Sequence, residues 1–261
     1  MKIKEVICKT ALSKSNLPGL DYSLNPYRGC EHNCAYCYVP NVLRIKRSDW
    51  GSFLNIKKNI PSVLSKELRN KKQAVVALST VTDPYQPIEK KYKLTRYCLE
   101  QLLKYDFPVH LQTKSSLIKR DFDIISKFSY PEVMFSIGTL NDNNRKLLEP
   151  RASSIKERLD ALKISSEIGI KTSIFFGPIY PNISLDKLSE IIEIFKENGA
   201  KEIMIDKLNF KPGVKENVQI TMKSNIQFLE KLSDVQTIYN KQRQILIKIC
   251  KKRNIRLVDA F

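Results

Sequence analysis

Apolar residues recur along the chain in short runs that alternate with longer amphipathic stretches. The runs are rich in β-branched and aromatic side chains, as in "AVVALS" (74–79) and "VMFSIG" (133–138). Near-continuous apolar runs of this length are typical of strands buried on both faces, which indicates a parallel sheet. We expect strands at 21–25, 74–79, 109–113, 133–138, 171–176 and 203–208, with a short "IRLVD" strand (255–259) closing the chain.

The stretches between these runs carry apolar residues at the spacing of one helix face. One of them begins with Ser154 followed three residues later by Glu157, the pattern of a capping box. Another ends before Gly199, a residue suited to terminate a helix. We expect helices at 93–104, 154–168, 185–198 and 222–252, the last of them broken near 233–234.

Six strands alternating with helices define the α/β class and imply right-handed βαβ units. Periodicity alone does not separate a partial (βα)6 barrel from an open doubly wound sheet. The length of 261 residues suits one α/β domain, and we see no repeat or long linker. We therefore expect a single domain, 1–261, with a core at about 20–210 and a C-terminal helical extension at 211–261.

Composition and charge indicate the cellular compartment and the kind of partner that we expect. Runs of about 18 apolar residues are absent, so we expect no membrane span. The first fifteen residues lack the apolar core of a signal peptide, which predicts a cytoplasmic protein. The net charge is +18, from 45 Lys and Arg against 27 Asp and Glu. This balance favours an anionic partner such as a nucleic acid, or a Lys-rich surface that serves solubility alone.

Three of the six cysteines lie within eight residues, in "CEHNCAYC" (30–37). Clustered thiols in a reducing compartment indicate a metal site. The motif follows the first expected strand, at the end where α/β folds bind ligands. Three thiolates can hold three irons of a [4Fe–4S] cluster and leave the fourth iron open to a small molecule. The alternative is a zinc knuckle in a nucleic-acid-binding protein without catalytic activity, with His32 as the fourth ligand.

The cysteine stretch resembles the signature of the radical S-adenosylmethionine (SAM) superfamily, in which an aromatic residue, here Tyr36, precedes the third cysteine. The chain more narrowly resembles the branch related to spore photoproduct lyase. The resemblance covers about residues 8–210 and is carried by "PGLDYSLNPYRGCEHNCAYCYVP", "STVTDPYQPIEKKYKLTR", "TKSSLIKRDFDII" and "FSIGTLNDNNRKLLEPRASSIKERLDAL".

The resemblance implies a [4Fe–4S] cluster held by Cys30, Cys34 and Cys37, with S-adenosylmethionine bound at the open iron. It implies reductive cleavage of this cofactor to a 5′-deoxyadenosyl radical that abstracts hydrogen from a substrate, such as a nucleic acid. The alternative substrates are a protein side chain or a small metabolite. An electron donor such as flavodoxin or ferredoxin is the implied redox partner. No membrane partner is expected.

The resemblance also assigns roles to residues that follow the expected strands. The implied contacts to S-adenosylmethionine are Tyr36, Gly177 and Pro178 for adenine, Thr80, Thr82 and Asp83 for the amino group, Lys114 and Ser115 for the carboxylate, and Ser136 for the ribose. Tyr38, facing the cavity, and Arg151, a carboxylate or substrate anchor, are the catalytic candidates. Because these positions fall at strand ends, they favour the partial barrel over the open sheet.

One position departs from the family pattern. Spore photoproduct lyases carry a hydrogen-donating cysteine in the loop after the second strand, and this chain has Thr80 near that place. A hydroxyl group is a far poorer hydrogen-atom donor than a thiol. The resemblance therefore predicts a related radical reaction on another substrate rather than repair of spore photoproduct. Cys8 is a candidate for a replacement thiol donor.

Overall fold

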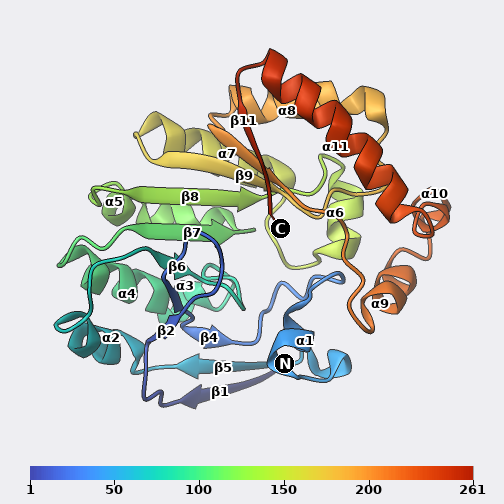
Figure 1. Ribbon diagram of the computed structural model, residues 1–261. Coiled ribbons are helices and arrows are strands. Elements are labelled where there is room, and N and C mark those ends of the chain that lie inside the picture. The colour runs from blue at the N-terminus through green and yellow to red at the C-terminus, as the bar shows by residue number, and fades with distance from the viewer. Residues whose placement is uncertain (261) are drawn as a thin grey trace.

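The computed structural model describes residues 1–260 and contains one curved sheet of eight strands (Figure 1). The strand order is β11-β10-β9-β8-β7-β6-β3-β2, and every neighbouring pair is parallel except β2 with β3. The strands are β2 (Leu12–Lys14), β3 (Tyr22–Leu24), β6 (Val76–Leu78), β7 (Val109–Thr113), β8 (Pro131–Ser136), β9 (Lys171–Phe176), β10 (Glu202–Ile205) and β11 (Arg256–Asp259).

All seven predicted strands are present, so the parallel α/β prediction is confirmed. Strand β6 is shorter than the predicted 74–79, and β10 ends at Ile205 rather than at residue 208. The edge strands β2 and β11 are not paired with each other, so the sheet curves into a partial barrel that does not close. Apolar side chains such as Val133 and Ile174 are fully buried within it.

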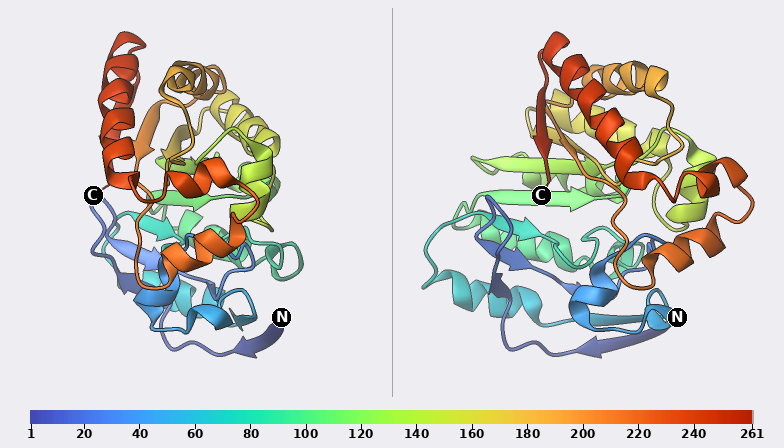
Figure 2. Two further views of the ribbon diagram at one scale, coloured as in Figure 1. Left: turned by 90° about the vertical axis from the view of Figure 1, so that its right-hand side faces the viewer. Right: turned by 45° about the vertical axis from the view of Figure 1, so that its right-hand side comes forward.

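Helices follow the strands and cover the outer side of the sheet (Figures 1 and 2). The predicted capping box at Ser154 is confirmed, with Glu157 bonding back to the backbone N–H of Ser154. The predicted break in the last helical region is also present, between α10 and α11. The helices on this side include α4 (Leu94–Leu103), α5 (Phe122–Ile125), α7 (Ile155–Glu167), α8 (Leu188–Glu197) and α11 (Val235–Lys252), whereas α10 (Ile226–Glu230) lies at the carboxyl ends of the strands.

A second, three-stranded sheet lies beside the start of the barrel and was not predicted. Strand β5 (Phe53–Lys57) pairs in parallel with β1 (Lys2–Val6) and antiparallel with β4 (Tyr27–Arg28). Because β4 ends at Arg28, this sheet fixes the backbone just before Cys30. Helix α1 (Val39–Leu43) follows the cysteines, and its first residue, Val39, packs with Cys30 and Trp50.

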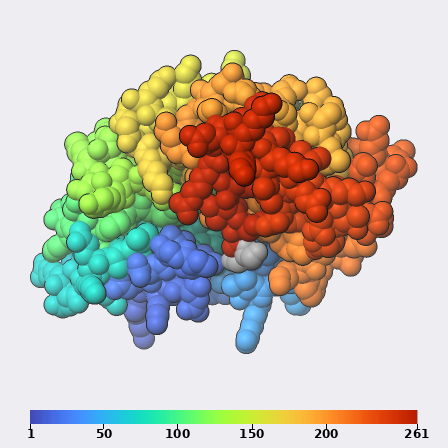
Figure 3. All heavy atoms as spheres, turned by 45° about the horizontal axis from the view of Figure 1, so that its top comes forward, coloured from blue at the N-terminus to red at the C-terminus, as the bar shows by residue number. Residues whose placement is uncertain are grey.

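Two helices of the C-terminal extension pack at the carboxyl ends of the strands. Helix α9 (Val214–Thr221), which was not predicted, and α10 form an apolar cluster that includes Ala35 of the cysteine loop and Tyr180. Figure 3 shows the C-terminal helix α11, in red, on the same face as the blue N-terminal segment. Among residues 1–260, none of the helices combines the length and apolar character needed to span a bilayer.

Candidate functional site

The three clustered cysteines line one cavity of about 920 Å³ on the inner side of the barrel. Cys30 and Cys34 are buried, and Cys37 is half-buried. The loop turns tightly, because the backbone N–H of Cys37 donates to the carbonyl oxygen of Cys34 at 3.1 Å. Asn33 adopts a positive φ of 49° at the centre of the loop. The sequence spacing therefore brings all three thiols to the same cavity.

Contacts from distant segments hold the cysteine loop in place. The carboxylate of Glu31 accepts the backbone N–H of Ile88 at 2.5 Å, and the side chain of Gln86 accepts the N–H of Glu31 at 2.8 Å. On the other side, the side chain of Asn217 donates to the carbonyl oxygen of Ala35 at 2.8 Å. These bonds satisfy buried backbone groups that would otherwise cost free energy.

Gly29 sets the path of the chain into this loop. Its φ is +100°, and a Cβ atom there would lie 2.6 Å from the carbonyl oxygen of Phe53 on β5. A side chain at residue 29 would therefore add backbone strain and a clash with a strand that cannot move away freely.

Gly29→Ala is expected to lower the free energy of unfolding by about 3 kcal/mol or more. The matched control is Gly19→Ala, because Gly19 also has a positive φ, +75°, but has open space where the Cβ would lie. The control should cost only about 1 kcal/mol. Urea unfolding of both variants measures the difference, and equal losses would show that the contact with Phe53 is unimportant.

Burial dominates the acidity of the three thiols. It raises the pKa of Cys30 to about 12 and raises the pKa values of Cys34 and Cys37. The positive charge of Lys114 opposes this shift at Cys34 and Cys37. Thiols in such a site bind metal as thiolates and release their protons when they do. The donor set thus suits an iron–sulfur cluster, for which thiolates are the usual ligands.

Asp83 organises the carboxyl ends of β6 and β7 from a buried position. Its carboxylate accepts the hydroxyl of Thr113 at 2.7 Å and the backbone N–H of Lys114 at 2.8 Å. The ring of His32 lies 3.3 Å away. Burial alone would raise the pKa of Asp83, but His32 and these hydrogen bonds outweigh it and hold the pKa well below its usual range. Asp83 therefore stays ionised and fixes the backbone beside the cavity.

Lys114 extends from the end of β7 into the cavity. Its ammonium group makes no ion pair within residues 1–260 and lies 6.0 Å from the centroid of the Tyr36 ring. Burial alone would lower the pKa of Lys114, but Cys34, Glu149 and Asp83 outweigh it, so the pKa is raised. An unpaired cation that remains charged inside a cavity is suited to bind a carboxylate.

A buried network supports Tyr36 from behind. The Tyr36 hydroxyl donates to Glu149, which accepts the Arg158 guanidinium at 2.5 Å. Arg158 also donates to the backbone oxygen of Ser136 at 2.8 Å. Burial acts to raise the pKa of Glu149, yet Arg158 and Lys114 hold that pKa below its usual value. The network links the cysteine loop to the end of β8.

The remaining predicted residues of the cavity come from several strand ends. Thr82 donates to the backbone oxygen of Gly29 at 2.6 Å, and the backbone N–H of Thr80 donates to Asn25 at 3.1 Å. Tyr38 is 47% exposed, which leaves its ring at the cavity mouth. Of the fourteen residues to which the resemblance assigns a site role, the twelve in this cavity are Cys30, Cys34, Cys37, Tyr36, Tyr38, Thr80, Thr82, Asp83, Lys114, Ser136, Gly177 and Pro178.

Two predicted site residues, and one candidate thiol, lie elsewhere. Ser115 is buried, but its hydroxyl accepts the backbone N–H of Leu117 and caps the turn that follows. Arg151 is exposed and does not line the cavity. Cys8 is also outside the lining, because its backbone is tied to Asn59 beside β5. The structure thus gives no support to Arg151 as a cavity anchor or to Cys8 as a thiol donor.

Other residues of the site were not singled out by the sequence. Gln112, whose side chain donates to Ser136 at 3.2 Å, lines the cavity between β7 and β8. Asp206 lines it at the end of β10, and burial raises the pKa of its carboxyl group. Trp50 lies against Cys30 and Cys37, and its buried indole N–H has no partner among the described residues. The signal available in the sequence for Gln112 and Asp206 was their position near the carboxyl ends of the predicted strands 109–113 and 203–208.

The site fits a cluster better than a single ion. Within residues 1–260, no three His, Cys, Asp or Glu side chains converge closely enough to hold one ion. The ligands of a four-iron cluster bind different irons and lie further apart than the ligands of one zinc ion. His32 is engaged with Asp83 and does not complete a zinc shell with the thiols. The unpartnered N–H of Trp50 would be available to donate to a sulfur of such a cluster.

Fold and site together define a partial α/β barrel with a three-thiol loop at the carboxyl ends of its strands. Residues 24–195 match the Radical SAM superfamily. An uncharacterized protein of Methanocaldococcus jannaschii is 36% identical over 185 residues, which cover 70% of this chain and 70% of that protein. The chain belongs to the radical SAM superfamily.

For two further sequence relatives, the match includes a smaller share of the relative's length. An uncharacterized protein of Acidianus two-tailed virus is 30% identical over 199 residues, which cover 72% of this chain and 65% of that protein. The Radical SAM Nalpha-GlyT isomerase of Pseudomonas phage M6 is 27% identical over 184 residues, which cover 69% of this chain and 38% of the isomerase. More than half of the isomerase therefore lies outside the match.

Solved structures share the fold at low identity. Spore photoproduct lyase complexed with dinucleoside spore photoproduct superposes with a TM-score of 0.72 at 14% identity, covering 99% of this chain and 82% of that one. SuiB of Streptococcus suis bound to S-adenosylmethionine gives a TM-score of 0.54 at 14% identity, covering 99% and 47%. These similarities show that the chain shares the fold of these proteins.

Proposed function

We propose that the chain is a radical SAM enzyme whose cluster is held by Cys30, Cys34 and Cys37. The observation that carries this proposal is that the three thiols and the unpaired ammonium group of Lys114 line one cavity. A [4Fe–4S] cluster, when reduced, supplies the electron that cleaves S-adenosylmethionine to a 5′-deoxyadenosyl radical. The protein contributes binding, orientation and exclusion of water.

The chain's own residues suit these tasks. Lys114 is placed to bind the carboxylate of the methionine moiety, and Asp83 keeps the adjoining backbone rigid. Tyr36 is held by Glu149 and offers its ring to the adenosine moiety. Ser136 and Gln112 present a hydroxyl and an amide toward the ribose. The backbone at Gly177 and Pro178 forms the wall on the β9 side.

For the substrate, a nucleic acid is our first candidate. The net charge of +18 supports it, since Lys and Arg favour polyanions. Spore photoproduct lyase, whose fold is shared, was solved with a dinucleoside photoproduct, which adds support at the level of analogy. Thr80 at the end of β6 supports a reaction other than spore photoproduct repair, because its hydroxyl replaces the expected thiol.

The test is anaerobic reconstitution with iron and sulfide, followed by dithionite and S-adenosylmethionine. We expect a brown protein whose visible absorption bleaches on reduction, and 5′-deoxyadenosine as a product. Transfer of deuterium from labelled DNA or RNA into 5′-deoxyadenosine would identify the substrate class, with labelled metabolites and peptides as comparison pools. A colourless protein with about one zinc per chain would contradict the proposal.

A further inference from the structure

A second depression lies on the outer side of the cysteine loop and is separate from the main cavity. It has a volume of about 260 Å³. Its lining comes from four segments, represented by Asn33 of the cysteine loop, by Arg47 and Trp50, by Pro150, and by Asn217 of α9. The reaction proposed above uses the inner cavity, so this outer depression has no role assigned to it.

Trp50 forms the wall between the two spaces, because it lines both of them. It is 5% exposed and packs with Cys30 and Cys37. Arg47, also in the depression, donates to the backbone oxygen of Cys37 at 2.8 Å. The floor of the depression is therefore in direct contact with two cluster ligands.

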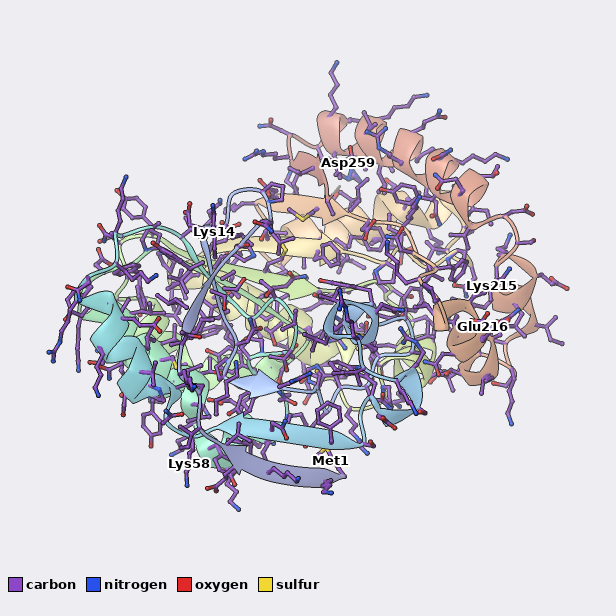
Figure 4. All side chains as sticks on the ribbon, turned by 60° about the horizontal axis from the view of Figure 1, so that its bottom comes forward. Met1, Lys14, Lys58, Lys215, Glu216 and Asp259 are labelled. Carbon is purple, nitrogen blue, oxygen red and sulfur yellow. The ribbon has the colours of Figure 1, made fainter. Side chains whose placement is uncertain are left out.

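Three of these four segments, taken with their flanking residues as 41–51, 146–151 and 211–223, form what we term the basic rim. Their exposed acidic residues are Asp49 and Glu216 alone. Figure 4 labels Lys215 and Glu216, which extend outward from α9. The exposed basic residues of the rim are Arg44, Lys46, Lys146, Arg151, Lys211, Lys215 and Lys223.

Exposed apolar side chains accompany these charges. Val42 is 57% exposed and Ile220 is 70% exposed, although both are large apolar residues. Small interfaces of redox proteins combine opposite charge with a modest apolar contact, which gives fast and transient association. The rim therefore has the properties expected of a site that receives an acidic redox protein.

We propose that the outer depression is the docking site of an acidic electron-transfer protein of the flavodoxin or ferredoxin class, and that Trp50 lies on the path of the electron. The proposal rests on the proposed function. One electron leaves the reduced carrier and enters the oxidised cluster, and no bond is formed or broken. A nucleic-acid substrate fits this place less well, because Trp50 separates the depression from the inner cavity where hydrogen is abstracted.

The test compares two charge-reversal variants in stopped-flow measurements under anaerobic conditions. The rim variant is Lys46→Glu with Lys215→Glu, and the matched control is Lys241→Glu with Lys248→Glu on α11, where both lysines are exposed. Bleaching of the reconstituted cluster is followed with reduced flavodoxin and, separately, with dithionite. We expect the rim variant to be reduced by flavodoxin about tenfold more slowly, with dithionite rates unchanged.

Several outcomes decide the matter. Equal slowing in the rim and control variants, or slowing with dithionite as well, would overturn the docking proposal. Loss of affinity for a labelled oligonucleotide, with flavodoxin reduction unaffected, would assign the rim to nucleic acid instead. If dithionite bleaches the chromophore and flavodoxin reduces the rim variant as fast as the unaltered protein, only the docking proposal is wrong. The absence of any chromophore defeats the proposed function itself.

Discussion

Cys34→Ala is expected to eliminate the iron–sulfur chromophore and the formation of 5′-deoxyadenosine together. Cys34 is the central thiol of the loop and is 8% exposed, so no other side chain can take its place without rebuilding the loop. Loss of partners outside the metal shell typically costs 10- to 100-fold in affinity or activity, and loss of a ligand should cost more than about 100-fold. Iron and sulfide analysis, visible spectra and product chromatography give the three readouts.

Cys98→Ala is the matched control. Cys98 is fully buried in the main core, on α4, and faces away from the cavity. Its truncation should cost about 1 kcal/mol of stability and leave the chromophore intact. If Cys34→Ala kept a full cluster, the ligand set of Cys30, Cys34 and Cys37 would be wrong.

The barrel strands could be predicted because burial on both faces leaves a continuous apolar run in the sequence. The three-stranded sheet could not. Strand β1 reads "KIKEV" and is mostly exposed, and β5 alternates between buried and half-buried residues. Their pairing joins residues about fifty positions apart, such as Lys2 with Phe53. Local pattern does not encode such a contact, so tertiary context determines this sheet.

The candidate site also contains some residues that the sequence could locate and others that it could not. The cysteines and the residues at strand ends could be located from spacing and topology. The hydrogen bond that holds Tyr36 could not be predicted, because its acceptor, Glu149, lies 113 residues further along the chain. The phrase "LEPR" drew attention to Arg151, whereas the structure buries Glu149, two residues earlier, and exposes Arg151. Which member of such a phrase turns inward depends on how α6 (Asp142–Leu148) ends.

Trp50 illustrates a further limit. A single tryptophan after a 3-10 turn has no spacing signal, and its contact with Cys30 and Cys37 arises only when β5 places it against the loop. Its unpartnered indole N–H is a feature that becomes visible in the folded chain. Hydrogen bonds to cluster sulfurs help to set reduction potentials, so this residue belongs in any account of how the cluster would be tuned.

Lys114→Met is expected to weaken binding of S-adenosylmethionine by about 10- to 100-fold. Methionine keeps the apolar stem but removes the ammonium charge, which makes no ion pair with the described residues of the cavity. Binding is measured by anaerobic equilibrium dialysis on protein with equal iron and sulfide content. Lys119→Met is the control. Because Lys119 is exposed, this variant should bind S-adenosylmethionine as tightly as the unaltered protein does.

Decarboxylated S-adenosylmethionine separates a direct contact from a structural effect. This analogue lacks the carboxylate that Lys114 is proposed to bind. The Lys114→Met variant and the unaltered protein should therefore bind the analogue with equal affinity. A variant that lost affinity equally for both ligands would show that residue 114 acts by shaping the cavity. Because Asp83 fixes the backbone of residue 114 through its N–H and not through the side chain, we expect the cavity to keep its shape and the two ligands to respond differently.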